Sequence, residues 1–216
     1  ICNSSCPKKS TLSPFIYMLC LHVMHEILFM NDNAVILIVE DGREGMFFAV
    51  WAPNAAAVHV IGSFNGWNED QYAMQKIGEI GIWTCFIPGV GENELYKYLI
   101  YTPEGRKLYK ADPFANYAEM RPGNASRTTD LSGFAWHDDA WMRAREKKNV
   151  FKEPLAIYEC HIGSFMKHPN NGTAEGFYNY REFADRIIEY LKEMKYTHVE
   201  LMGIAEHPFD GSWGYQ

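Results

Sequence analysis

The chain has 216 residues, which is enough for one or two domains. Its hydrophobic content of 47% and charged content of 22% are those of an ordinary globular protein. The formal net charge of −7 argues against nucleic acid or an anionic membrane surface as a partner, because both attract concentrated lysine and arginine.

Residues 1–40 form a divergent segment to which we assign no role. An apolar run follows two lysines there, but Pro14, His22 and Glu26 interrupt it and no small-residue cleavage site follows. We therefore predict no membrane span. The histidines of this segment lack a third ligand at a defined spacing, so no metal site is expected. The five cysteines form no zinc pattern, and their odd number favours a reducing, cytoplasmic setting.

Residues 41–135 are predicted to form an immunoglobulin-like antiparallel β-sandwich. Short runs of aromatic and β-branched residues recur about every ten positions, with turn-forming residues between them. Within the last run, alternation places Tyr96 and Tyr98 on one face and Lys97 on the other. The runs are Met46–Trp51, Ala57–Ile61, Ile82–Ile87 and Leu95–Tyr101.

Residues 136–153 are rich in charge and are interpreted as a linker between two domains. Trp136 and Trp141 bound the beginning of this segment. Because large aromatic residues are usually buried, we interpret both as packing anchors at the junction.

Residues 154–216 have the pattern of a strand, a helix and a second strand. The strands are Leu155–Gly163 and Thr197–Met202, and the intervening helix repeats its apolar residues every 3.6 positions. Asn179 is a suitable N-cap, and Glu182 three residues later can complete a capping box. Two strands joined by a helix should be parallel. This α/β pattern after a sandwich predicts a second domain.

A loop from Glu206 to Gln216 follows the second predicted strand. It contains Trp213 and Tyr215 among glycines and polar residues. Aromatic rings stack on the C–H face of a sugar, while carboxylate and amide groups bond its hydroxyls. The loop is therefore a candidate sugar-binding surface.

Four ordered motifs extend over about four-fifths of the chain. They are Phe48–Ala55 with Val58–Asn68, Tyr96–Tyr98 with Lys110–Ala115, Ile157–Phe165, and His207–Gln216. Together they resemble the first part of a bacterial-type glycogen (1,4-α-glucan) branching enzyme, in the α-amylase superfamily or glycoside hydrolase family 13. The first two resemble a glycogen-binding sandwich of the carbohydrate-binding module 48 type. The last two resemble the first βαβ unit of a TIM (β/α)8 barrel, which would here be incomplete.

The resemblance implies an enzyme that cleaves an α-1,4-glucan and transfers the segment to a 6-hydroxyl, making an α-1,6 branch in glycogen. A retaining mechanism needs two carboxyl groups roughly 5–5.5 Å apart. In the family these belong to later barrel strands, so we expect no catalytic residue before the end of the chain at Gln216. We predict that the chain alone is inactive, uses no cofactor, and has the rest of its own barrel as partner. The alternative is a non-catalytic glucan-binding or regulatory module with a barrel remnant.

The resemblance also assigns binding residues. Tyr215 matches a tyrosine that stacks on the sugar at the cleavage site, although its ring could instead pack beneath the loop; Trp213 and Gln216 are further candidates. Trp67 and Lys97 match glucan-binding positions of the sandwich. The second tryptophan expected near residues 107–108 is absent, which favours a purely structural sandwich.

Gly203 departs from the resemblance, because the family usually has a proline at the end of the second strand. Glycine leaves the backbone dihedral φ unrestricted. We therefore expect the chain to be looser at this position.

Overall fold

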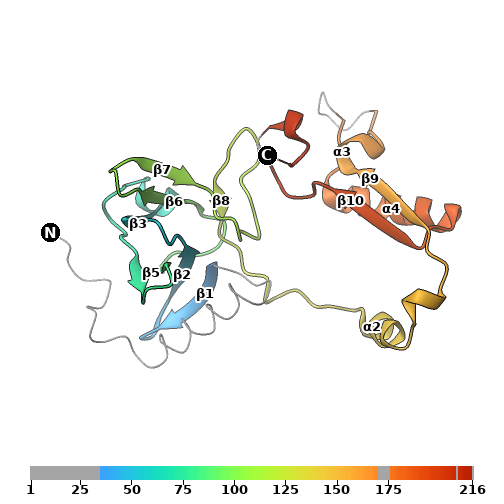
Figure 1. The fold of residues 1–216 in the computed structure, drawn as a ribbon, viewed down its shortest axis with the longest axis horizontal. Coiled ribbons are helices and arrows are strands. Elements are labelled where there is room, and N and C mark those ends of the chain that lie inside the picture. Colours follow the sequence, from blue (N-terminus) through green and yellow to red (C-terminus); the bar gives the residue numbers. More distant parts are fainter. Residues whose placement is uncertain (1–34, 170–175, 208, 216) are drawn as a thin grey trace. The chain divides into compact units, whose positions relative to one another are not determined.

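The computed structural model describes residues 35–169, 176–207 and 209–215 (Figure 1). The chain divides into two compact units between Gly133 and Phe134. All the strand pairs described in the first unit are antiparallel, and the second unit contains a parallel pair with helices. This order confirms the predicted succession of a β-sandwich and an α/β segment.

The first unit consists of two sheets. One has the strand order β1-β2-β5-β4, and the other has the order β3-β6-β7 with β8 paired to β6. The strands are β1 (Val35–Glu40), β2 (Arg43–Trp51), β3 (Ala57–Gly62), β4 (Gln75–Ile77), β5 (Ile82–Pro88), β6 (Leu95–Tyr101), β7 (Lys107–Lys110) and β8 (Ser126–Arg127).

The core of the first unit is formed by residues from both sheets. Met46 and Phe48 of β2 and Ile87 of β5 pack with Tyr96 and Tyr98 of β6, and all five are buried. The two tyrosines share a face, as alternation predicted. Burial of these large apolar and aromatic side chains is the main source of stability for such a sandwich.

The sandwich begins earlier than the predicted position 41. Strand β1 pairs with β2 along its whole length, from Val35 opposite Phe48 to Glu40 opposite Arg43. The two-residue turn between them has φ values of 49° at Asp41 and 74° at Gly42, as suits a tight hairpin. The predicted boundary was therefore too late, although Asn31, Asp32 and Asn33 separate β1 from the apolar run before it.

The second unit contains strands β9 (Ile157–His161) and β10 (His198–Met202), which pair in parallel. Helix α4 (Tyr180–Met194) lies between them in sequence and begins with the predicted capping box. Asn179 accepts hydrogen bonds from the backbone N–H groups of Arg181 and Glu182, and Glu182 accepts one from the Asn179 N–H. Shorter elements are α3 (Ile162–Phe165) and the 3-10 turns η2 (Val150–Lys152) and η3 (Asp210–Ser212).

The predicted linker also contains regular structure. Helix α2 (Asp139–Glu146) lies within it. Its tryptophans are not buried within their own unit, where Trp136 is 75% exposed and Trp141 is 60% exposed, so their role as packing anchors at the junction stays a prediction. Each has a local partner instead: the Trp136 ring meets the Phe134 ring edge-on, and Arg145 lies over the Trp141 ring one helical turn later.

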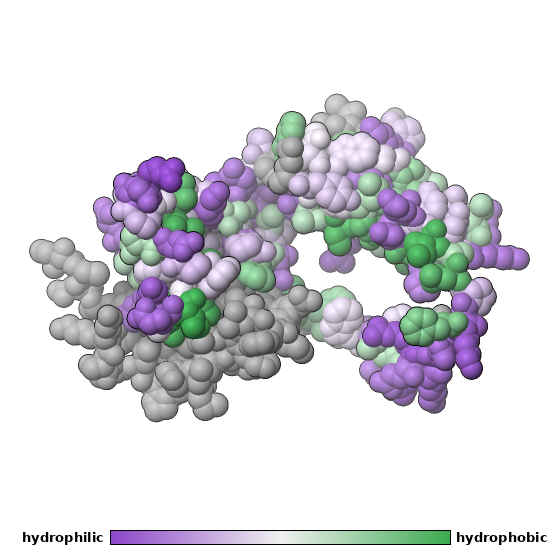
Figure 2. Space-filling view, viewed as in Figure 1, coloured by the Kyte–Doolittle hydropathy of each residue, from purple (hydrophilic) through white to green (hydrophobic). Residues whose placement is uncertain are grey.

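The second unit has a small buried core and much exposed apolar surface. Cys160 of β9 packs with Phe183 and Ile187 of α4. Apolar residues nevertheless reach the surface of this unit (Figure 2), among them Ile188, Val199, Leu201 and Ile204. Cys160 is a free thiol. Within the described ranges, no helix is both long and apolar enough to cross a membrane.

Candidate functional site

A groove lies on the outer face of the sheet that contains β3, β6 and β7. Lys97 of β6 pairs opposite Ile61 of β3, and Tyr109 of β7 pairs opposite Leu99, two residues beyond Lys97. Directly paired residues and residues two apart share a face, so these side chains lie on one side of the sheet. They contribute to a cavity of about 350 Å³, here called the sheet groove, which is lined by Ile61, Trp67, Glu69, Lys97, Tyr109, Glu119 and Ala125.

Trp67 reaches the sheet groove from a tight turn. The 3-10 turn η1 (Ser63–Asn65) precedes it, and the Trp67 N–H donates to the Gly62 carbonyl at 2.8 Å. Trp67 itself has a φ of 61°, a left-handed conformation that is costly for a side chain of this size. The turn therefore holds the indole, 39% exposed, at the groove.

The ammonium group of Lys97 is held by the loop of residues 119–125. Its Nζ donates a hydrogen bond to the Asn124 side-chain oxygen. The loop is closed by two bonds, in which the Glu119 N–H donates to the Ala125 carbonyl at 2.9 Å and the Ala125 N–H donates to the Glu119 carboxylate at 3.0 Å. The structure thus brings the two predicted residues, Trp67 and Lys97, to one groove with an amide beside them.

Tyr109 is a groove residue that sequence reasoning missed, together with its partner Glu69. Its hydroxyl donates to one oxygen of Glu69 at 2.5 Å, and Lys107 Nζ donates to the other at 2.5 Å. These hydrogen bonds hold the pKa of the Glu69 carboxyl below its usual value and raise the pKa values of Lys107 and Tyr109. The available signal was the alternation of Lys107 and Tyr109 along a short strand, next to the position where a second tryptophan was expected.

The loop after β10 lies at the carboxyl end of the parallel pair. Met202 of β10 pairs opposite His161 of β9, so the two strands end at the same edge. The Trp213 ring stacks on the His161 ring with centroids 4.9 Å apart and planes 20° apart. Ser212 is buried, and its hydroxyl donates to the Phe209 carbonyl at 2.8 Å. The loop is therefore folded onto the strand ends.

Tyr215 extends from this loop with its side chain 65% exposed. Its backbone N–H donates to the Ser212 carbonyl at 3.1 Å, which fixes its position behind η3. The ring is therefore not buried beneath the loop within this chain. Gln216, the third predicted binding residue here, lies outside the described residues.

Tyr180 anchors the same loop from the first turn of α4. Its hydroxyl lies within hydrogen-bond distance of the Ile204 carbonyl, at 3.0 Å, and of the Glu206 carboxylate, at 3.1 Å. Burial, with the Glu206 charge beside it, raises the pKa of Tyr180 to about 12. In the sequence, Tyr180 is one member of the 3.6-residue apolar repeat of the helix, and that repeat does not indicate a contact with the loop.

The expectation that Gly203 loosens the backbone was wrong. Its φ is +45°, and a Cβ there would lie 2.0 Å from the Trp213 carbonyl oxygen. A proline, whose φ is fixed near −65°, cannot adopt this conformation. Gly203 therefore allows the Trp213–Gly214 backbone to approach the end of β10 closely.

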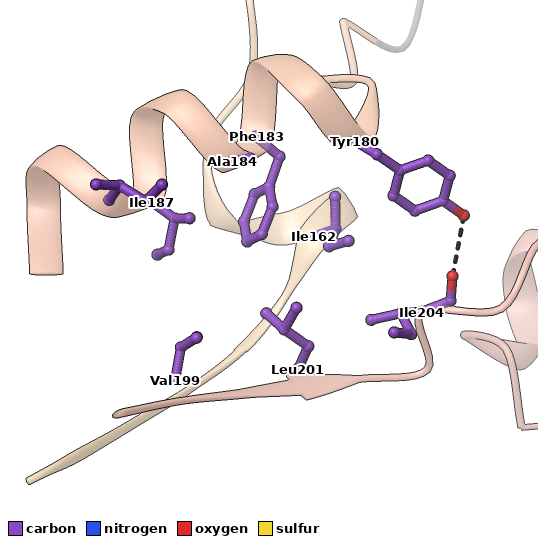
Figure 3. Close-up of a pocket in the computed structure, with 9 residues that line it drawn as sticks. Ile162, Tyr180, Phe183, Ala184, Ile187, Val199, Leu201 and Ile204 are labelled. Atoms are coloured by element: carbon purple, nitrogen blue, oxygen red, sulfur yellow. Dashed lines mark hydrogen bonds between the residues drawn. The ribbon is translucent and has the colours of Figure 1, made fainter. Parts of the chain in front are cut away.

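A second cavity, of about 320 Å³, lies between α4 and β10 (Figure 3). Phe183, Val199 and Leu201 point into the space between helix and strand, while the Tyr180 hydroxyl bonds the Ile204 carbonyl at its edge. The lining is almost entirely apolar, so the cavity offers little to bind sugar hydroxyls. In the part of the chain that the structure describes, no three potential metal-ligand side chains come together.

Known proteins resemble the first unit of the chain by itself and also most of the chain as a whole. Residues 37–115 match the family model of carbohydrate-binding module 48, described as the isoamylase N-terminal domain. A 1,4-alpha-glucan branching enzyme from Butyrivibrio fibrisolvens is 68% identical over 177 residues, which are 82% of this chain and 28% of that enzyme. The chain is thus similar to a branching enzyme over most of its length.

Other relatives agree with this placement. A 1,4-alpha-glucan branching enzyme from Bacillus cytotoxicus is 49% identical over 83% of this chain and 27% of its own length. The chain thus spans little more than a quarter of the branching enzymes that it matches.

Two solved structures share the fold. A putative α-amylase from Salmonella typhimurium has a TM-score of 0.59 at 24% identity, covering 87% of this chain and 27% of that one. A pullulanase from Bacillus acidopullulyticus has a TM-score of 0.55 at 24% identity, covering 86% of this chain and 24% of that one. The branching-enzyme assignment itself rests on the sequence relatives.

Proposed function

We propose that this chain is the amino-terminal part of a glycogen branching enzyme, whose full-length form cleaves α-1,4-glucan and transfers the segment to a 6-hydroxyl. Its sequence relatives carry that activity in their names. The two carboxyl groups that a retaining mechanism needs would come from later barrel strands. By itself, the chain would bind glucan and make no branches.

The sheet groove is the observation that carries glucan binding for this chain. Trp67 supplies an aromatic ring, and Lys97 and Asn124 supply a hydrogen-bonding pair beside it. Both kinds of group are needed to hold a sugar, which has an apolar C–H face and hydroxyl edges. We propose that the groove binds a linear α-glucan and brings it to the enzyme.

The loop after β10 has a different proposed role. The exposed ring of Tyr215 would stack on the sugar at the cleavage site, and Trp213 and Gln216 would lie beside it. Stacking Trp213 on His161 and anchoring the loop through Tyr180 would keep this surface rigid before substrate arrives. Orienting a substrate in advance lowers the entropy cost of reaction.

We further propose that the enzyme works in the cytoplasm. The buried thiol of Cys160 forms no disulfide, which suits a reducing compartment.

Binding is tested by titrating maltoheptaose, a linear α-1,4-oligosaccharide, into the 216-residue chain. We expect Trp67→Ala to weaken binding by about fivefold or more, since the loss of an aromatic anchor that contributes about 1 kcal/mol raises Kd about fivefold. Trp51→Ala is the matched control, because Trp51 is also exposed but lies in β2, in the other sheet. Equal binding by wild type and Trp67→Ala would exclude the groove as the site.

Branching is tested in the full-length protein with amylose as substrate. Tyr215→Ala should lower the rate of α-1,6 bond formation by about tenfold or more while maltoheptaose binding to the sandwich stays unchanged. Absence of branching by the wild-type full-length protein would instead favour a non-catalytic glucan-binding module.

A further inference from the structure

Asn65 connects the two ends of the turn that carries Trp67. Its side-chain oxygen accepts a hydrogen bond from the Gly62 N–H at 3.0 Å, and its side-chain nitrogen donates one to the Asn68 carbonyl at 2.9 Å. Gly62 is the last residue of β3, and Asn68 directly follows Trp67. An N–H at one end and a carbonyl at the other fix which way the amide points. The Asn65 side chain therefore links the end of the strand to the residue beyond the indole.

The backbone of this turn is strained next to the indole. Gly66 and Trp67 both have a φ of 61°, in the left-handed region. Glycine adopts this conformation readily, but a residue with a large side chain keeps it only where its surroundings hold it. The two hydrogen bonds of Asn65 supply such a hold, because they reach the residues on either side of the strained pair. The position of the indole thus depends on the bonds that close the turn.

These two bonds require a donor and an acceptor in one short side chain. Asparagine has both, in its amide N–H and its carbonyl oxygen, whereas an ionised aspartate of the same shape only accepts. A carboxylate at this position would keep the bond from the Gly62 N–H, but it would face the Asn68 carbonyl with a second acceptor. The turn therefore distinguishes an amide from the acid of the same shape.

We propose that Asn65 is the positioning residue for Trp67, and that its amide holds the indole at the sheet groove before a glucan arrives. This inference rests on the proposed glucan binding and adds to it the residue that prepares the site. Asn65 is not among the residues that line the groove, so it acts through Trp67. A ring held in its binding orientation has less freedom to lose when a ligand binds, and releasing that ring weakens binding.

The experiment measures maltoheptaose binding to the 216-residue chain by calorimetry. Asn65→Asp should raise the Kd about two- to tenfold, because the turn is released at the Asn68 end and the indole regains freedom that binding must remove. The same change added to Trp67→Ala should have no further effect, since the ring that Asn65 holds is then absent. Asn54→Asp is the matched control, because it adds the same charge in another exposed turn of the first unit.

Fluorine NMR of the chain labelled with 5-fluorotryptophan observes the indole directly. The Trp67 resonance is assigned by its loss in Trp67→Phe. In Asn65→Asp this resonance should broaden or shift, while those of Trp51 and Trp83, which lie in the other sheet, stay in place. In the free wild type we expect one narrow Trp67 line. That measurement tests the inference even where a variant does not fold, because it needs no substitution at Asn65.

The outcomes separate this inference from the function on which it rests. If the wild type binds no maltoheptaose, glucan binding by the groove is wrong and the inference fails with it. If Trp67→Ala weakens binding while a folded Asn65→Asp does not, the groove stands and Asn65 does not position the ring. Equal weakening by Asn65→Asp in the wild type and in Trp67→Ala would show that Asn65 acts by another route. A broad Trp67 line in the free wild type that sharpens with maltoheptaose would also overturn the inference.

Discussion

Asp112 is the most buried carboxylate described in the sandwich, and its hydrogen bonds connect β6 with the segment that follows β7. One of its oxygens accepts from the Tyr96 hydroxyl at 2.8 Å and from the Tyr98 hydroxyl at 3.3 Å. The other accepts from the Phe114 N–H at 2.9 Å. Burial raises the pKa of Asp112 above its ordinary value, although these hydrogen bonds act in the opposite direction. The net effect is that ionisation is harder in the folded protein.

This shift gives a signed prediction for stability. A carboxyl whose folded pKa is raised holds more protons in the folded than in the unfolded chain, so its contribution to stability decreases as pH rises through that window. The window begins near the ordinary value of 3.8 and extends upward to the folded pKa. We expect the free energy of unfolding of the wild type, relative to Asp112→Asn, to fall as pH is raised from about 3 to about 7.

The measurement is urea unfolding of both proteins at several pH values in that range. Asp112→Asn can lower stability at every pH, because an amide cannot accept all the hydrogen bonds that a carboxylate accepts. The titration of Asp112 is reported only by a change with pH in the difference between the two unfolding free energies. A constant difference between the two proteins across the range would contradict the raised pKa.

Helix α4 shows how one element depends on its first turn. Asn179 and Glu182 satisfy three backbone N–H groups between them, which the helix itself leaves without intrahelical partners. The same helix end is where Tyr180 holds the loop that carries Trp213 and Tyr215. The cap therefore supports both the helix and the proposed substrate-positioning surface.

Removing the cap should loosen both. Asn179→Ala is expected to cost about 1 kcal/mol of stability in the second unit, the usual value for an N-cap. Faster amide hydrogen exchange in the first turn of α4 of Asn179→Ala would show this loss of stability. Asn179→Asp is the control, because aspartate caps equally well. If exchange in the first turn is unchanged in Asn179→Ala, the capping box does not stabilise the helix.

At the scale of the whole molecule, the second unit leaves an apolar face without a partner among the described residues. Ile188 of α4 and Leu201 of β10 line the apolar cavity and remain partly exposed. A parallel pair with two open edges also has unpaired backbone groups. In a full barrel, later strands and helices would cover both kinds of surface.

We therefore expect the 216-residue chain to self-associate when it is produced alone. Sedimentation velocity should show species larger than the monomer, increasing with protein concentration. Ile188→Lys should reduce this association by placing a charge on the apolar face, whereas Glu189→Lys, one position away, should not. A monomer at every concentration tested would contradict the prediction.

The sequence by itself determined the elements whose patterns are local. The four principal sandwich strands, the parallel strands β9 and β10, and the capped start of α4 all follow from periodicity and from residues next to one another in the chain. The resemblance to branching enzymes followed in the same way, because its motifs are contiguous. Strand β1 was missed, although Asn31, Asp32 and Asn33 separate it from the apolar run before it.

Tertiary structure decided which distant residues meet. The pairing of β6 with β7 places Tyr109 in the groove with Trp67. There Tyr109 bonds the Glu69 carboxylate, which lies 40 positions away in the sequence. The parallel register of β9 and β10 places His161 under Trp213, and the close approach at Gly203 fixes the loop between them. Such contacts depend on strand register and turn geometry, which a one-dimensional pattern does not specify.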